Sequence, residues 1–123
     1  MIHGKELAET IASLAWQKKA EDIVILDLRG LSNITDYFVI CSGTSKPHLK
    51  AIRTEVKTKL RENSGISASS ADGEPESLWM VLDYGDVIVH IFHRSRREFF
   101  ALEDLWSDAP RSEWSPEPAA IPR

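Results

Sequence analysis

The sequence predicts an α/β (α+β) fold in which a single mixed β-sheet is flanked by helices. Its 123 residues suit one domain and leave no room for a second full one. Apolar residues recur at helical spacing in three segments and form short apolar runs in four others, in the order αββαββα. The first two runs are apolar on both faces, which is typical of interior strands covered by helices.

The N-terminal part of the chain predicts one helix followed by two strands. The helix is expected over about residues 5–19, where three apolar residues share one stripe: Leu7, Ile11 and Leu14. The strands are "IVILDL" (residues 23–28) and "YFVICS" (residues 37–42). The connection between them, "RGLSNIT", contains Gly30 and Asn33 and is therefore expected to be a loop.

The segment "GTSKP" (residues 43–47) is expected to end the second strand and begin a second helix. Thr44 or Ser45 can cap the exposed backbone amides there, and Pro47 is tolerated in a first helical turn. The buried stripe of this helix comprises Leu49, Ile52, Val56 and Leu60. The small, polar residues 64–77 then predict a loop with room for a short extra strand.

Two further strands and a third helix complete the predicted domain. "LWMVL" and "DVIVHIF" are joined by a turn at residues 83–86, in which Gly85 supplies the positive φ that such a turn needs. The third helix is expected over about residues 95–106, with Phe99, Leu102 and Trp106 on one stripe.

The end of the chain has a different composition. It carries four prolines and shows no apolar period: Pro110, Pro116, Pro118 and Pro122. Such a segment cannot bury enough apolar surface to offset the entropy of ordering it. We therefore predict a folded domain over residues 1–109 and a disordered tail over residues 110–123.

The net charge of −4 is unevenly distributed along the chain. Residues 1–70 carry 10 basic and 8 acidic side chains, whereas residues 71–108 carry 9 acidic and only 3 basic ones. An acidic half-domain repels phosphate backbones, which predicts little direct nucleic-acid binding, and it is attracted to basic protein surfaces. A solvated acidic face that only maintains solubility is the alternative interpretation.

The sequence predicts no membrane association and a cytoplasmic location. No apolar run approaches the roughly 20 residues that span a bilayer. The N-terminal segment lacks an uninterrupted apolar core and carries Glu6 and Glu9, so it resembles neither a secretory signal nor a transit peptide. The single cysteine, Cys41, excludes an intramolecular disulfide.

We predict no catalytic residues, no metal site and no cofactor. The four histidines form no HxH or HxxxH pair, and His90 is expected to be a core or interface residue satisfied by a backbone or carboxylate partner. "GTS" resembles the turn that opens nucleotidyltransferase folds, but no Asp-x-Asp or Asp-x-Glu pair follows Ser45, which favours helix capping. Glu55 and Lys57 have nuclease spacing but diverge on a helix.

Several motifs, in order and at the right spacing, resemble the Iojap family of bacterial ribosomal silencing factors. They are "KKAEDIVILDLRGLSNITDYFVICSGTS", "WMVLDYGDVIVHIF", "RREFFALEDLW" and "DAP", and they span about residues 7–110. The resemblance implies a nucleotidyltransferase-like fold without the catalytic carboxylates, and a non-enzymatic protein. It implies docking on the large ribosomal subunit at ribosomal protein L-fourteen, a steric block of small-subunit joining, and repression of translation under nutrient limitation. It also implies a homodimer when the protein is free of the ribosome.

The candidate partner-binding residues lie in the acidic half of the chain and mostly match the family pattern: Trp79, Asp83, Tyr84, Asp86, Arg97, Phe100, Glu103 and Trp106. Phe100 departs from it, because tyrosine is common at that position. The two hairpin aspartates are expected to face outward, toward a basic ribosomal protein. Two other functions remain open: an assembly factor or adaptor on the same subunit, and, more remotely, a nucleotidyltransferase-like enzyme.

Overall fold

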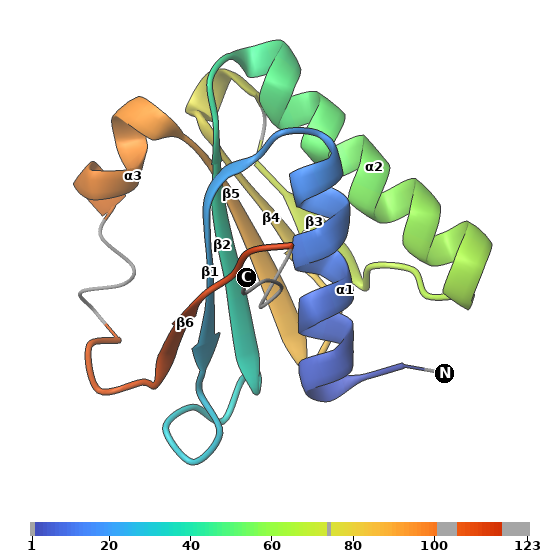
Figure 1. Cartoon of the computed structure of the whole chain (residues 1–123), viewed down its shortest axis with the longest axis vertical. Coiled ribbons are helices and arrows are strands. Elements are labelled where there is room, and N and C mark those ends of the chain that lie inside the picture. The colour runs from blue at the N-terminus through green and yellow to red at the C-terminus, as the bar shows by residue number, and fades with distance from the viewer. Residues whose placement is uncertain (1, 74, 101–105, 117–123) are drawn as a thin grey trace, which may run out of the picture.

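The computed structural model describes residues 2–73, 75–100 and 106–116, apart from the side chains of residues 70, 72, 75 and 98–100. Within these residues, six strands form one sheet in the order β3-β4-β5-β2-β1-β6 (Figure 1). The elements follow the chain as α1 (Gly4–Gln17), β1 (Glu21–Asp27), β2 (Tyr37–Gly43), α2 (Lys46–Ser64), β3 (Ser70–Asp72), the 3₁₀ helix η1 (Pro75–Ser77), β4 (Trp79–Asp83), β5 (Val87–His93), α3 (Arg94–Phe100) and β6 (Arg111–Glu113).

The sheet is mixed, as predicted. The central strands β2 and β5 pair in parallel, and all other neighbouring strands pair antiparallel. The predicted order αββαββα is confirmed for the long elements. The loop before β4 does hold a short extra strand, β3, which pairs with β4 at one edge of the sheet.

Helices α1 and α2 cover one face of the sheet and enclose the main core (Figure 1). The buried residues of both helices include the predicted stripes: Leu7, Ile11, Leu14, Leu49, Ile52, Val56 and Leu60. They pack against alternate residues of β1, β2, β4 and β5 that point to this face. This arrangement leaves the opposite face of the sheet with much less cover.

The ends of α2 form as the sequence indicates. Ser45 is the N-cap, and its side-chain oxygen accepts a hydrogen bond from the backbone N–H of His48 at 3.1 Å. Gly65 ends the helix in the left-handed conformation, with φ of 67°. No helix among the described residues is both long and apolar enough to cross a lipid bilayer.

The prediction of a disordered tail is wrong for residues 110–116. Residues 111–113 form β6, which pairs antiparallel with the outer edge of β1. The N–H of Asp27 donates to the carbonyl of Pro110, and the N–H of Trp114 donates to the carbonyl of Ile23, both at 2.9 Å. The segment satisfies backbone groups that an uncovered β1 edge would leave open. Residues 117–123 lie outside the described residues.

The third helix is shorter in its described part than predicted. It is described from Arg94 to Phe100, while residues 101–105, and with them Leu102, lie outside the described residues. Trp106 is in a turn rather than in the helix, because the N–H of Ala109 donates to its carbonyl at 2.9 Å. The chain then leads from this turn into β6.

Replacing Trp114 with alanine should destabilise the protein. Its side chain is half-buried against the main core, so its loss should lower the free energy of unfolding by about 2 kcal/mol, below the cost for a fully buried tryptophan. The melting temperature should fall by roughly 8 °C. Thermal unfolding followed by circular dichroism measures this, with Ser115→Ala at an exposed neighbouring position as the control. Equal melting temperatures would show that the C-terminal segment does not pack on the sheet.

Candidate docking surface

The face of the sheet opposite α1 and α2 carries a half-exposed cluster of large side chains. Strand pairing places Trp79 opposite Phe92, Val81 opposite His90 and Asp83 opposite Ile88, so these six residues point to one face. Phe38 joins them from β2, and Trp106 packs over Phe38 from the turn beyond α3. We call this set the open sheet face: Phe38, Trp79, Val81, Asp83, Ile88, His90, Phe92 and Trp106.

Aromatic contacts organise the open sheet face. The Trp79 ring stacks on Phe92 with 5.3 Å between ring centroids. Phe38 meets His90 edge to face at 4.5 Å and Trp106 at 6.1 Å. Such pairs add about 0.5–1.5 kcal/mol each beyond area burial and restrict the side chains to defined positions. These contacts hold the rings in defined positions, while Phe38, Trp79, Val81, Ile88 and Trp106 stay partly exposed.

His90 lies at the centre of this face and is 6% exposed. The indole N–H of Trp79 donates to its Nδ1 at 3.1 Å, so Nδ1 carries no proton and the neutral ring carries one on Nε2. The expected backbone or carboxylate partner is therefore replaced by an indole. Burial lowers the pKa of His90 to about 4. Within the described part of the chain, its Nε2 is buried and has no hydrogen-bond partner.

The hairpin aspartates do not simply face outward as expected. Both are half-buried: Oδ1 of Asp83 accepts the N–H of Gly85 at 2.8 Å, and Oδ2 of Asp86 accepts the N–H of Gly4 at 2.5 Å. The carbonyl of Asp86 also accepts the N–H groups of Asp36 and Tyr37. These contacts tie the hairpin tip to the start of α1 and to the β1–β2 loop. Their first role is to hold the fold together.

Tyr84 packs against the helix-covered core rather than on the open sheet face. Its hydroxyl is buried and, among the described residues, has no hydrogen-bond partner. Burial raises the pKa of Tyr84 to about 12, so the phenol is neutral at physiological pH. The Tyr84 side chain therefore has a structural role in the core rather than a role in partner contact.

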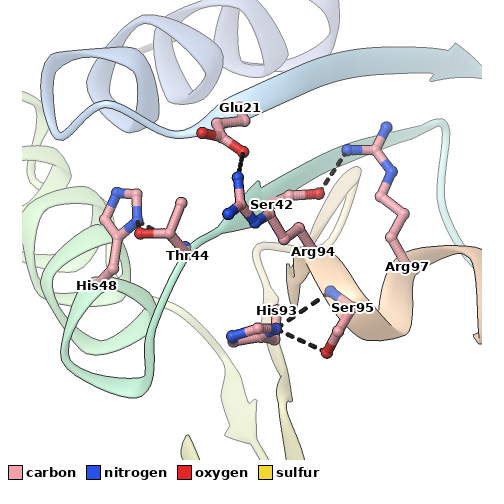
Figure 2. A network of polar contacts seen from close by, with 8 residues as sticks. All are labelled: Glu21, Ser42, Thr44, His48, His93, Arg94, Ser95 and Arg97. Carbon is pink, nitrogen blue, oxygen red and sulfur yellow. Dashed lines mark hydrogen bonds and ion pairs between the residues drawn. The ribbon is translucent and has the colours of Figure 1, made fainter.

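The eight predicted binding residues thus separate into groups. Trp79, Asp83 and Trp106 belong to the open sheet face, whereas Asp86 and Tyr84 serve the hairpin tip. Arg97 lies on α3, and its Nη1 donates to the Ser42 hydroxyl at 2.9 Å, at the far end of β2 (Figure 2). The side chain of Phe100 and the whole of Glu103 lie outside the described residues. The prediction missed Phe38, Val81 and Ile88. Strand alternation with Trp79 and His90 marks Val81 and Ile88, whereas Phe38 lies on another strand.

Polar groups of the "GTS" turn form hydrogen bonds within the protein. Nε2 of His48 donates to the carbonyl of Lys18 at 2.7 Å, which leaves Nδ1 to accept the N–H of Thr44 at 2.9 Å. A Cβ on Gly43 would approach Leu49 Cδ2 to 2.8 Å, so a larger residue there would force the Leu49 side chain to shift. Together with the cap at Ser45, these contacts clamp the α1–β1 turn to the β2–α2 turn. Figure 2 shows the contact between Thr44 and His48.

No group of three or more metal-ligating side chains is present among the described residues. The thiol of Cys41 is fully buried, and burial raises its pKa to about 12. A buried neutral thiol of this kind is inert toward metals and electrophiles.

The sequence matches the family model described as "Ribosomal silencing factor during starvation" over residues 2–122. The chain belongs to this family. The resemblance seen in the sequence motifs is confirmed, and the match runs through β6. Ribosomal silencing factors are regulatory, non-enzymatic proteins.

Individual relatives agree with this membership. The chain is 41% identical over 109 residues to a ribosomal silencing factor of Bacillus subtilis, covering 89% of this chain and 92% of that protein. A crystal structure of a Chromobacterium violaceum protein superposes with a TM-score of 0.81 at 25% identity, covering 98% and 95% of the two chains. A mouse protein named "Mitochondrial assembly of ribosomal large subunit protein 1" is 31% identical over 86% of this chain and 47% of its own length.

The burial of His90 in this silencing factor should make its stability depend on pH. The unfolded chain binds the proton near pH 6.5 and the folded chain only near pH 4, so stability is fully present above about pH 6.5 and falls as the pH drops toward 4. The free energy of unfolding should fall by up to about 3 kcal/mol over this pH range.

Urea unfolding of the parent protein and of His90→Gln at pH 7.5 and pH 5.0 measures this loss. The variant should lose less stability between the two pH values, because glutamine does not titrate. If parent and variant lose the same free energy, His90 is not the buried titrating group.

Proposed function

We propose that this ribosomal silencing factor docks on the large ribosomal subunit through its open sheet face. The family resemblance gives ribosomal protein L-fourteen as the contact. Bound there, the protein stands in the path of the small subunit, blocks subunit joining and represses translation when nutrients are limiting. The observation that carries this proposal is the half-exposed aromatic cluster around Trp79, with the buried Nε2 of His90 at its centre.

The chemistry of the open sheet face suits the centre of a protein interface. Contiguous apolar surface that is left exposed marks an interaction site, and tryptophan is enriched among residues whose truncation weakens binding most. Because Nε2 of His90 is already shielded from solvent within the chain, a partner carbonyl would reach it only after neighbouring side chains moved. An unsatisfied buried donor costs about 1–3 kcal/mol, so this hydrogen bond would favour the bound state.

The charge of the chain favours a basic partner for the proposed docking. Residues 71–108 carry 9 acidic and 3 basic side chains, and this excess lies in the same part of the chain as most of the open sheet face. An acidic surface accelerates encounter with a basic ribosomal protein and disfavours direct contact with RNA. The bound protein would therefore contact protein more than nucleic acid, and would act in the cytoplasm.

The open sheet face also favours a homodimer of the free protein. Half-exposed aromatics on a sheet are stabilised when a second copy covers them, which supports a homodimer away from the ribosome. In that arrangement the dimer interface and the ribosomal interface overlap. Docking would then require the dimer to dissociate.

An assembly factor acting on the same subunit is the second candidate. It is supported by the name of the mouse relative, which refers to assembly of the large ribosomal subunit. The two functions differ in what accumulates when the protein is removed. Loss of an assembly factor leaves immature large subunits, whereas loss of a silencing factor leaves mature subunits that continue to join during starvation.

A charge placed in the middle of the open sheet face should abolish docking. Val81→Glu introduces a carboxylate at a half-exposed position of this face, and Thr54→Glu makes the matched change at an exposed position of α2. A buried, unpaired charge at an interface should weaken binding by at least about 1.4 kcal/mol, or tenfold.

Sedimentation with purified large subunits and a translation assay that depends on subunit joining measure this effect. Thr54→Glu should bind and repress like the parent. If Val81→Glu does so too, with both variants folded by circular dichroism, the open sheet face is not the docking surface.

The protein should transfer no nucleotide. The oxygen of Ser45 caps α2, and the neighbouring turn is held by His48. Incubation with Mg²⁺, labelled nucleoside triphosphates and protein or RNA acceptors should give the same background for the parent and for Ser45→Ala. The variant should lose about 1 kcal/mol of stability with the cap and remain folded. A transfer signal that disappears in Ser45→Ala would identify an enzyme instead.

A further inference from the structure

A cavity of about 730 Å³ lies beside the open sheet face at the end of β2, where Ser42 of its lining pairs with Phe92. Its lining includes Ser42 from the end of β2, and Arg94 and Arg97 from the start of α3. The two parallel strands continue into helices on opposite faces of the sheet, α2 on one and α3 on the other (Figure 1). A divergence of this kind opens a crevice beyond the carboxyl ends of the strands, and ligands of α/β sheets bind in such crevices.

Three arginines from two distant segments line this cavity: Arg94, Arg97 and Arg111. Arg97 donates to the Ser42 hydroxyl at 2.9 Å, and Arg94 reaches Glu21 at 3.6 Å (Figure 2). Arg111 is 3.6 Å from Glu113. The two ion pairs are longer than the roughly 2.7–2.9 Å of a charge-assisted hydrogen bond. Their arginine side chains are 62% and 47% exposed, so both ion pairs contribute little to stability in water.

Aromatic surface borders the same cavity. Trp16, near the end of α1, is 48% exposed and lines it together with Trp114. Asp22 supplies one of the two carboxylates of the lining, with Glu113 as the other. Strand β1 bulges between Glu21 and Val24, and Asp22 adopts a positive φ of 50° there. Bulges re-aim side chains, and positive φ at a non-glycine residue is found where local geometry is specified by a site.

We propose that this cavity binds a nucleoside di- or triphosphate. The three guanidinium groups would hold the phosphates, because their planar forks match phosphate oxygens. The indole of Trp16 would stack on the base. Asp22 accepts hydrogen bonds from ribose hydroxyls, which explains an acidic residue beside the arginines. The volume lies within the 300–1,000 Å³ typical of small-molecule sites.

A free mononucleotide is favoured over an RNA strand as the ligand. The chain carries a net charge of −4, which opposes the approach of a polyanion along its surface. The arginines converge on one cavity rather than forming a track that could follow a backbone. Binding here involves no transfer chemistry and does not depend on the open sheet face.

Isothermal titration calorimetry of the full chain with ATP, GTP, adenosine and inorganic tripolyphosphate tests the proposal. ATP or GTP should bind saturably with one site per chain. Arg94→Gln and Arg111→Gln should each weaken this binding about tenfold. Arg96→Gln, an exposed position on the same helix that does not line the cavity, should change it less than twofold. Trp16→Leu should weaken nucleotide binding about tenfold and leave tripolyphosphate binding unchanged.

Each of four results would overturn the assignment. The first is that neither nucleotide binds saturably at millimolar concentration, and the second is that Arg94→Gln and Arg96→Gln lose equal nucleotide affinity. The third is that tripolyphosphate binds as tightly as ATP and Trp16→Leu does not change ATP binding. The fourth is that a single-stranded RNA oligomer binds more tightly than ATP and displaces it. Melting curves of the variants confirm that they are folded. Because the isolated protein is used, the result is separate from ribosome docking.

Discussion

The parallel pairing of β2 with β5 is the constraint on which the rest of the structure depends. The two strands are in register from Tyr37 opposite Val87 to Gly43 opposite His93. Parallel neighbours cannot be joined by a tight turn, so the chain must cross over between them, and α2 with the β3–β4 ribbon forms that crossover. The crossover places α2 beside α1 on one face. The opposite face is left to α3 and to the turn that follows it.

This asymmetry explains why one face of the sheet is a core and the other is a surface. Two amphipathic helices bury their stripes against the first face. The second face has to stabilise itself through contacts among its own side chains, which here are the stacked rings of Trp79, Phe92 and His90. An aromatic layer with a buried, neutral histidine is stable in isolation, and covering it with a partner would lower its free energy further. If the proposed docking takes place here, stability and docking draw on the same residues.

The edges of the sheet are protected by short segments at both ends. Residues 70–72 cover β4, and residues 111–113 cover β1. Each is too short to be stable alone, but each pairs with backbone groups that would otherwise face another chain. On the β1 side, the same segment brings Arg111 toward Arg94 and Arg97 and so helps to enclose a cavity. Strand β6 thus both protects the β1 edge and contributes to the arginine cluster.

The sequence by itself determined the class of fold, the long elements and the family. Helical stripes, apolar runs and the Gly85 turn depend on local periodicity and backbone preference, which neighbouring residues carry. Only the tertiary structure decided that the Trp79 indole satisfies His90, that Asp86 binds the N–H of Gly4, and that the polar residues 111–113 form a strand. These contacts join residues up to 89 positions apart, as in the pairing of Val24 with Glu113, and their partners have no local pattern in common. Pairing between distant segments is set by the packing of the whole sheet, so local sequence signals cannot contain it.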